Sequence, residues 1–213
     1  MKNLKIVNTE NLNTGKQLPV MEEFYSLQGE GFHTGSAAYF LRVGGCDVGC
    51  NFCDVKESWN ADIHPLVSVD EVVMRIVEQK SPCVVVTGGE PCLYNLEYLC
   101  QQLHQNNISV HLETSGSEKL SGKFDWICFS PKKGTLIQQE FYEQANELKV
   151  IIENENDFAW AEENAKKMNK KALLFLQPEW SKFDTITSVI VDYILKNPKW
   201  KISLQSHKYM KIP

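Results

Sequence analysis

Three cysteines stand close together in one glycine-rich segment of the chain. Cys46, Cys50 and Cys53 have the spacing C-x3-C-x2-C and fall within the stretch from Gly44 to Asp54. A loop with this spacing can wrap three thiolates around one metal centre, because its glycines relieve the tight backbone turns. The segment is therefore the first place at which this sequence could carry out chemistry.

Three interpretations of these cysteines are open. They could be thiols without a metal, although closely spaced exposed thiols oxidise easily. They could hold zinc, but a structural zinc site usually has four ligands in paired C-x2-C units, and His64 lacks a typical spacing for the fourth. They could instead hold an iron–sulfur cluster. Because electron-transfer clusters usually have four cysteine ligands, three would leave one iron open to bind another molecule.

The other four cysteines are predicted to be core residues. Cys83 begins an apolar run, Cys128 lies within another, and Cys92 and Cys100 lie in or near a helix. Free cysteine is among the most buried residue types, which disfavours a ligand role. An odd total of seven cysteines without an export signal also disfavours a disulfide framework. We therefore expect a reducing compartment, the cytoplasm.

Strand-length apolar runs alternate with amphipathic segments and predict the elements that position these residues. Several runs are continuous, as in parallel strands that are covered on both faces. The predicted strands are Ala37–Val43, Cys83–Thr87, Ser109–Glu113, Trp126–Ser130, Glu147–Ile152, Ala172–Gln177 and Lys201–Gln205. The predicted helices are Val69–Gln79, Asn95–Gln105, Asp157–Met168 and Thr185–Lys196. A capping box at Ser68 begins the first helix, and Asp184 is the expected N-cap of the last.

This alternation predicts an α/β fold with a mostly parallel sheet. An open doubly wound sheet and a curved (β/α) barrel both fit it. A closed eight-fold barrel typically needs about 250 residues, so 213 residues favour a partial (β/α) barrel. We expect a single domain over residues 1–213, with an N-terminal extension over residues 1–20 and a cysteine loop over residues 44–60.

Polar segments directly follow several predicted strands and should meet at one rim of such a fold. They are Gly44–Cys46, Gly88–Pro91, Thr114–Gly116, Pro131-Lys132, Pro178 and Ser206–Lys208. The run Thr87-Gly88-Gly89-Glu90-Pro91 is by itself only a turn after a strand.

Composition excludes several classes of protein. The chain is 43% apolar and 23% charged, which disfavours disorder, and its net charge of −5 disfavours a protein that grips duplex DNA. The longest apolar runs have five residues or fewer, so we expect no segment that spans a bilayer, and the polar N-terminal stretch leads us to expect no signal peptide. We expect neither nucleic-acid nor membrane partners.

The cysteine spacing, with Phe52 directly before the last cysteine, resembles the fingerprint of radical S-adenosylmethionine (SAM) enzymes. Gly88-Gly89-Glu90 resembles their GGE motif, where backbone groups meet the SAM amino group. The resemblance implies a [4Fe-4S] cluster on Cys46, Cys50 and Cys53. The open iron would chelate SAM, and reductive cleavage would release a 5′-deoxyadenosyl radical.

Further motifs resemble the 7-carboxy-7-deazaguanine synthase family of queuosine and 7-deazapurine biosynthesis, from about Met21 to Pro213. These motifs are Ser26–Gly31, Leu41-Arg42, Glu113–Gly116, Ser130–Lys132, Gln205–Lys208 and the terminal Pro213. The resemblance implies a lyase that contracts 6-carboxy-5,6,7,8-tetrahydropterin to 7-carboxy-7-deazaguanine with loss of ammonia. It also implies a homodimer and an electron donor such as flavodoxin, and it leaves the catalytic groups beyond the cluster and the SAM radical unknown.

The resemblance also carries ligand contacts onto this chain. SAM contacts are implied for Phe52, Cys53, Asp54, Gly89, Ser130, Pro131, Lys132, Gln177, Pro178, Glu179 and Trp180. Substrate contacts are implied for Leu27, Gln28, Gly29, Arg42, Thr87, His207 and Pro213. The alternatives are a surface salt bridge for Arg42, a solvated side chain for Lys132 and a surface position for His207.

One position departs from the family pattern. The family usually has a threonine two residues after the last cysteine, where its hydroxyl binds a Mg2+ that bridges to substrate, and this chain has Val55 there. Mg2+ prefers six oxygens and takes few of them from protein. It could therefore bind through substrate and water, or through Asp54 or Glu57.

Two other functions are compatible with parts of the pattern. A glycyl-radical activase would share the cysteine and GGE motifs but would not need Leu27–Glu30, Arg42 or the C-terminal motif. A non-catalytic iron–sulfur or zinc module acting as a redox sensor would not cleave SAM.

Overall fold

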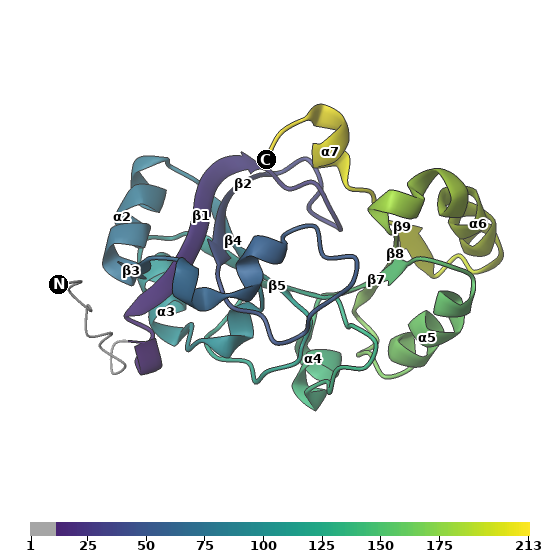
Figure 1. Ribbon diagram of the computed structural model, residues 1–213, viewed down its shortest axis with the longest axis horizontal. Coiled ribbons are helices and arrows are strands. Elements are labelled where there is room, and N and C mark those ends of the chain that lie inside the picture. Colours follow the sequence, from purple (N-terminus) through teal and green to yellow (C-terminus); the bar gives the residue numbers. More distant parts are fainter. Residues whose placement is uncertain (1–11) are drawn as a thin grey trace.

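The computed structural model describes residues 12–213, and within them one curved sheet organises the chain (Figure 1). Its nine strands lie in the order β3-β1-β2-β4-β5-β6-β7-β8-β9. Their bounds are β1 Gln17–Leu27, β2 Ala37–Val43, β3 Leu66–Ser68, β4 Cys83–Gly88, β5 Ser109–Thr114, β6 Trp126–Phe129, β7 Glu147–Ile152, β8 Leu173–Pro178 and β9 Trp200–Ile202.

The strand order decides between the two predicted architectures. From β2 onward neighbouring strands of this order pair in parallel, beginning with β2 and β4 and ending with β8 and β9, whereas β1 pairs antiparallel with β2 and with β3. A doubly wound sheet needs a point at which the order reverses, and the parallel part has none. The predicted mostly parallel partial barrel is confirmed, with β3 and β9 as the two edges of an unclosed sheet.

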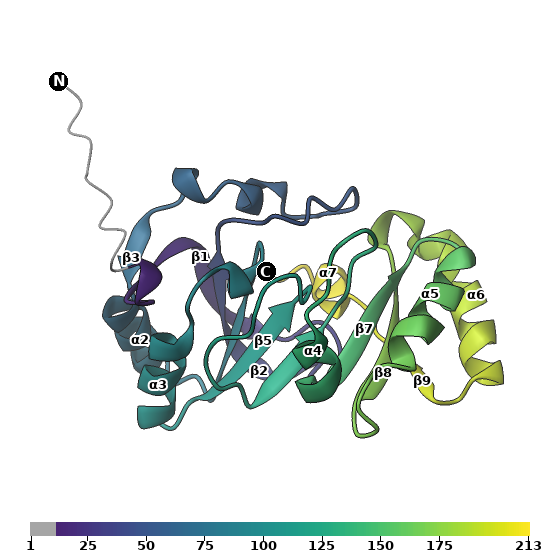
Figure 2. The ribbon, with the colours of Figure 1, turned by 90° about the horizontal axis from the view of Figure 1, so that it is seen from below.

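The helices follow from the same winding. Right-handed crossovers that all run in one direction place their helices on one side of the sheet, and Figure 2 shows α2 to α6 on the outer side of the curve. The helices are α2 Val69–Glu78, α3 Glu97–Gln105, α4 Gln139–Gln144, α5 Asn156–Ala165, α6 Phe183–Lys196 and α7 Ser206–Met210. No helix of residues 12–213 is long and apolar enough to cross a bilayer.

The core lies between the sheet and these helices. In α2, Val69, Val72, Val73 and Ile76 have helical spacing and are buried against the strands. Along each strand successive side chains alternate between the two faces. The outer face of the sheet is therefore apolar, which leaves the inner face free to carry polar side chains.

Two strands and the beginnings of two helices differ from the sequence predictions. β1 and β3 were not predicted, because β1 is only half-buried and carries Glu22 and Glu23 in place of an apolar run. β1 begins at Gln17, so the last residues of the predicted extension belong to the sheet, while residues 1–11 lie outside the described part. A single domain over the whole chain stays a prediction.

The expected capping interactions are also absent from the described helices. α2 begins directly after Ser68, but the Ser68 side chain makes no capping hydrogen bond. Strand pairing fixes this end instead, because the Val69 amide donates to the Lys16 carbonyl at 2.9 Å. α6 begins at Phe183, so Asp184 lies in its first turn and is not the N-cap. Ser68 is therefore the N-cap residue of α2 as predicted, but without the hydrogen bond of a capping box, whereas the prediction of Asp184 as an N-cap was wrong.

Candidate active site

A cavity of about 660 Å3 lies at the carboxyl ends of the parallel strands. Its walls come from the segments that follow β2, β4, β5, β6, β7, β8 and β9, and from the chain end at Pro213. The cysteine loop runs across these strand ends, and α7 lies in the gap between the two sides of the open sheet (Figures 1 and 2). The rim predicted from the sequence is thus one continuous cavity wall.

The cysteine loop presents all three of its thiols to this cavity. Cys46, Cys50 and Cys53 are partly buried, and each lines the cavity. The start of the loop is fixed to the following 3-10 turn, because the Gly45 amide donates to the Ser58 carbonyl at 2.6 Å. Burial raises the pKa of both Cys46 and Cys50, so these thiols need a metal to become thiolates near neutral pH.

The three loop sulfurs are not gathered as the ligands of one zinc ion would be. Within residues 12–213, one group of His, Cys, Asp and Glu ligand atoms lies within 4.8 Å of one another, and it does not include the cysteine loop. Ligands of a single zinc ion would be that close, whereas a [4Fe-4S] cluster places each thiolate on a different iron. His64 is also engaged elsewhere, since its Nε2 lies 2.9 Å from the Glu57 carbonyl oxygen. The three thiols therefore fit an iron–sulfur cluster.

The GGE segment packs directly on the beginning of the cysteine loop. The Gly89 amide donates to the Val43 carbonyl at 2.9 Å, and the Glu90 amide donates to the Gly45 carbonyl at 2.8 Å. Gly88 has a φ of +122°, a conformation that side chains rarely allow. A Cβ atom on Gly89 would lie 2.0 Å from the Gly45 carbonyl oxygen. Gly88 and Gly89 therefore allow the GGE segment to approach the cysteine loop this closely.

Glu90 joins the GGE segment to the end of β5. Its side chain is only 1% exposed, and its carboxylate accepts hydrogen bonds from the Thr114 hydroxyl at 2.6 Å and from the Ser115 amide at 2.8 Å. It also accepts from the Ser115 hydroxyl and the Cys92 amide. A carboxylate with this many donors is stable when buried. Glu90 therefore positions two motifs that lie far apart in the sequence.

The predicted ligand contacts converge on the cavity, with one exception. The lining residues among them are Leu27, Gln28, Gly29, Arg42, Phe52, Cys53, Asp54, Thr87, Gly89, Ser130, Lys132, Gln177, Pro178, Glu179, Trp180, His207 and Pro213. Pro131 is buried and does not line the cavity, although both of its neighbours do. The ligand that each of these residues contacts stays a prediction.

Comparison with known proteins agrees with this geometry. Residues 41–171 match the radical SAM superfamily. The 7-carboxy-7-deazaguanine synthase of Flavobacterium psychrophilum is 56% identical over 93% of this chain and 94% of its own length. The chain belongs to the 7-carboxy-7-deazaguanine synthase family. The synthase of Synechocystis sp. is 47% identical over 90% of this chain and 92% of its own.

A solved structure of the family has the same fold. The crystal structure of QueE from Escherichia coli matches with a TM-score of 0.82 and 29% identity, over 94% of this chain and 99% of that one. Membership of the 7-carboxy-7-deazaguanine synthase family does not favour the glycyl-radical activase or the redox module. A [4Fe-4S] cluster and SAM are the cofactors that the radical SAM superfamily implies.

Three of the ligand contacts had a plainer alternative. The Arg42 Nε lies 2.9 Å from Glu22 Oε1, so Arg42 does form an ion pair near the surface, and it also lines the cavity. Lys132 is not a freely solvated lysine: its Nζ donates to the Ser130 carbonyl and hydroxyl oxygens at 2.5 and 2.6 Å, and burial lowers its pKa. His207 is half-buried, lines the cavity and has a pKa that burial lowers.

Sequence reasoning assigned no role to a charged group on the inner face of the sheet. The Lys149 ammonium contacts Glu30 at 2.6 Å and Glu113 at 2.9 Å, and all three residues line the cavity. Burial alone would raise the pKa of Glu30, but Lys149 and neighbouring amide donors lower it to about 2. The sequence did contain an indication of this group, because Lys149 lies within the apolar run Glu147–Ile152. A charge buried in such a run is costly unless it is paired.

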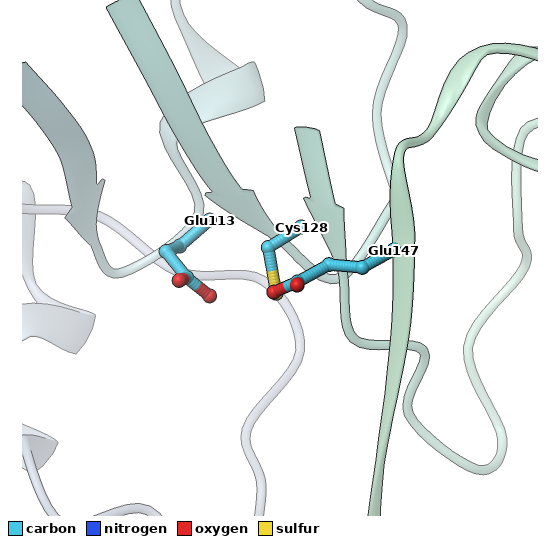
Figure 3. Close-up of side chains that lie close together, drawn as sticks. All are labelled: Glu113, Cys128 and Glu147. Carbon is cyan, nitrogen blue, oxygen red and sulfur yellow. The ribbon is translucent and has the colours of Figure 1, made fainter. Parts of the chain in front are cut away.

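Glu113 also belongs to a second group below the cavity. Glu113, Cys128 and Glu147 reach toward one another from β5, β6 and β7 (Figure 3), and they are the one group of possible metal ligands found within residues 12–213. Burial raises the pKa of the Cys128 thiol and of Glu147. The neighbouring Lys149 already supplies positive charge to Glu113. The raised pKa values of Glu147 and Cys128 favour their neutral forms, which limits the negative charge of this group.

Proposed function

We propose that this chain is a radical SAM lyase that converts 6-carboxy-5,6,7,8-tetrahydropterin to 7-carboxy-7-deazaguanine and ammonia, in queuosine or 7-deazapurine biosynthesis. The observation that carries the proposal is one cavity lined by the three thiols, the GGE segment and an arginine suited to a carboxylate. The close family relatives support the same reaction. The pterin loses one nitrogen and three hydrogens as ammonia, and the rest of its atoms remain in the product.

One side of the cavity is suited to SAM. Cys46, Cys50 and Cys53 would hold a [4Fe-4S] cluster, which together with SAM supplies the radical that removes a hydrogen from the substrate. SAM is regenerated, so it acts as a cofactor. Gly89 exposes backbone at this wall, and Lys132 places a positive charge near Cys50. The remaining SAM contacts are proposed for Phe52, Asp54, Ser130, Pro131, Gln177, Pro178, Glu179 and Trp180.

A second set of residues that line the cavity is suited to the carboxypterin. The Arg42 guanidinium can pair with its carboxylate through two parallel hydrogen bonds. The C-terminal carboxylate of Pro213 can accept hydrogen bonds from an amino-pyrimidinone edge, and Ser26 Oγ donates to the Pro213 oxygen at 3.4 Å. The Ser206 amide and hydroxyl both donate to the Gly29 carbonyl, which brings the C-terminal segment to the loop after β1. Further substrate contacts are proposed for Leu27, Gln28, Gly29, Thr87 and His207.

A divalent metal would have to bind without the family threonine. Val55 lines the cavity but offers no side-chain oxygen. Asp54 also lines the cavity, and its carboxylate accepts from Lys208 Nζ at 2.9 Å, whereas Glu57 does not line it. We therefore expect Mg2+ to bind through substrate, water and Asp54, and to bind weakly.

The setting of the reaction is also part of the proposal. Free thiols and an oxygen-sensitive cluster suit a reducing cytoplasm. Reductive SAM cleavage requires an electron donor, for which a flavodoxin is a suitable class. A homodimer is proposed from the family resemblance, and light scattering of the purified protein measures it.

One anaerobic experiment tests the function. The protein is reconstituted with iron and sulfide and incubated with SAM, dithionite and the carboxypterin, with and without Mg2+. We expect 7-carboxy-7-deazaguanine and ammonia in equal amounts, with many turnovers for each SAM. Cleavage of SAM without the deazaguanine would favour another radical SAM enzyme, and absence of 5′-deoxyadenosine would favour a non-catalytic redox module.

A further inference from the structure

A buried lysine on the inner face of the sheet lines the cavity. Lys149 lies on β7 with its side chain 5% exposed, and its Nζ donates to Glu30 Oε2 at 2.6 Å and to Glu113 Oε2 at 2.9 Å. Glu30 follows β1 and Glu113 lies on β5, so one ammonium connects three separate segments. Because burying a charge is costly without partners, the two carboxylates and the ammonium stabilise each other.

Each carboxylate accepts a hydrogen bond from an amide side chain that lines the cavity, and Glu30 also interacts with Gln177. Glu30 Oε1 accepts from Gln205 Nε2 at 2.9 Å, and Glu113 Oε1 accepts from Gln28 Nε2 at 3.2 Å. Gln28 and Gln205 come from opposite ends of the chain, and both line the cavity. Lys149 is therefore the common origin of two hydrogen-bonded arms, Lys149–Glu30–Gln205 and Lys149–Glu113–Gln28.

We propose that Lys149 is a positioning residue for the carboxypterin: it fixes the two carboxylates and, through them, the amide groups of Gln28 and Gln205 that face the substrate. This proposal rests on the function proposed above. An amino-pyrimidinone ring presents N–H donors and a carbonyl acceptor at fixed angles. A wall that recognises it must hold its carboxylate and amide groups in one orientation, since a mismatched polar group is left unpaired.

A merely structural role for Lys149 predicts a different result. If the ammonium only balances buried negative charge, its removal should weaken the fold as a whole, and SAM and carboxypterin binding should decline together. If it positions the two arms, carboxypterin binding should decline far more than SAM binding, because neither arm includes a cysteine ligand or the GGE segment, and the arm Lys149–Glu113–Gln28 includes no proposed SAM contact.

The test replaces Lys149 by methionine, which has a similar shape and no charge. We expect the KM for carboxypterin to rise about tenfold or more, the magnitude for loss of charge-assisted hydrogen bonds. The Kd for SAM, the iron content and the formation of 5′-deoxyadenosine without substrate should stay within about twofold of wild type. Lys199→Met is the matched control, because Lys199 pairs with Glu162 at 2.5 Å away from the cavity, and we expect wild-type values from it.

A second variant covers the case in which Lys149→Met does not fold. Glu113→Gln keeps the shape of a partly exposed side chain and removes the charge that Lys149 contacts on the arm that ends at Gln28; we expect the same selective rise in KM. A wild-type KM in either folded variant, or a parallel loss of SAM and carboxypterin binding, would overturn the proposal. Turnover by the wild-type protein is measured first, so a failure of the proposed reaction is seen before any variant is compared.

Discussion

Gly89 and Gly45 are in backbone contact: a Cβ atom on Gly89 would lie 2.0 Å from the carbonyl oxygen of Gly45. The same two segments are held by the hydrogen bond from the Glu90 amide to that carbonyl at 2.8 Å. The GGE segment after β4 and the cysteine loop after β2 therefore form one rigid unit. Parallel pairing of β2 with β4 brings the two strand ends together, and glycine permits the final contact.

We expect Gly89→Ala to weaken SAM binding, because the added methyl group must push the GGE segment away from the cysteine loop. Overpacking of this kind typically costs about 1–3 kcal/mol, and we expect SAM affinity to fall at least about tenfold. Equilibrium binding of SAM to the reconstituted protein measures it. Gly134→Ala is the control, because it adds backbone strain at a φ of +79° in open space. Wild-type SAM affinity in Gly89→Ala would show that the contact is dispensable.

The three loop cysteines should be equally indispensable. Alanine at Cys46, Cys50 or Cys53 should remove the brown cluster absorbance and all SAM cleavage, because three thiolates leave no spare ligand. Iron content and 5′-deoxyadenosine formation are the measurements. Cys100→Ala is the matched control, since Cys100 is buried and does not line the cavity. Full iron content and turnover in any one of the three loop variants would refute the assignment of the cluster.

The boundaries of most parallel strands were predictable to within one residue, although β9 ends at Ile202 and not at Gln205. The polarity of the inner face of the sheet was not predicted. The apolar runs predicted the first and last residues of β2 and β7 correctly, because the outward side chains of these strands pack on helices. The same runs led us to expect coverage on both faces. The structure instead places Arg42, Thr87 and Lys149 on the inner face of the barrel, lining the cavity. A lysine within an apolar run was the visible sign of this arrangement.

Other features depend on contacts between segments that no local pattern specifies. β1 is held by pairing with β2 and β3. Its charged residues interrupt the apolar pattern from which a strand is predicted. Glu90 was recognised as part of a motif, but its bonds to Thr114 and Ser115 follow from the neighbouring positions of β4 and β5. The predicted site residues came from the family resemblance, and Pro131 alone among them lies outside the cavity wall.

Arg42 should matter for carboxypterin far more than for SAM. Loss of a charge-assisted contact to a carboxylate typically costs about 1.5–3 kcal/mol, or roughly 10- to 150-fold in affinity. We expect this loss in Arg42→Ala, and also a marked loss in Arg42→Lys, because lysine keeps the charge but lacks the planar fork. The KM for carboxypterin and the Kd for SAM are measured in parallel.

The Glu22 ion pair allows a specific control for Arg42. Glu22→Gln removes the charged partner 2.9 Å from Arg42 Nε and leaves the guanidinium in place. Because such exposed pairs contribute at most about 1 kcal/mol, we expect stability and KM close to wild type. Unchanged carboxypterin affinity in Arg42→Ala would instead mean that Arg42 serves only this surface ion pair.

Val55 makes the sharpest prediction about the divalent metal. Threonine has nearly the shape of valine and adds the oxygen that the family pattern supplies to Mg2+. Val55→Thr should therefore show stronger stimulation of turnover by Mg2+, or a tighter apparent Mg2+ constant, than the wild-type protein. Val55 lines a cavity that also carries charged side chains, so the new hydroxyl should find partners there and cost little stability; in a dry site it would cost about 1–3 kcal/mol. The measurement is a Mg2+ titration of turnover at saturating SAM and substrate, with thermal unfolding alongside.

Asp54→Asn in the wild-type background is the companion variant, because Asp54 lines the cavity directly before Val55 and is acidic. Strong and equal Mg2+ dependence with valine and with threonine would mean that another ligand has replaced the hydroxyl, and loss of that dependence in Asp54→Asn would identify the ligand as Asp54.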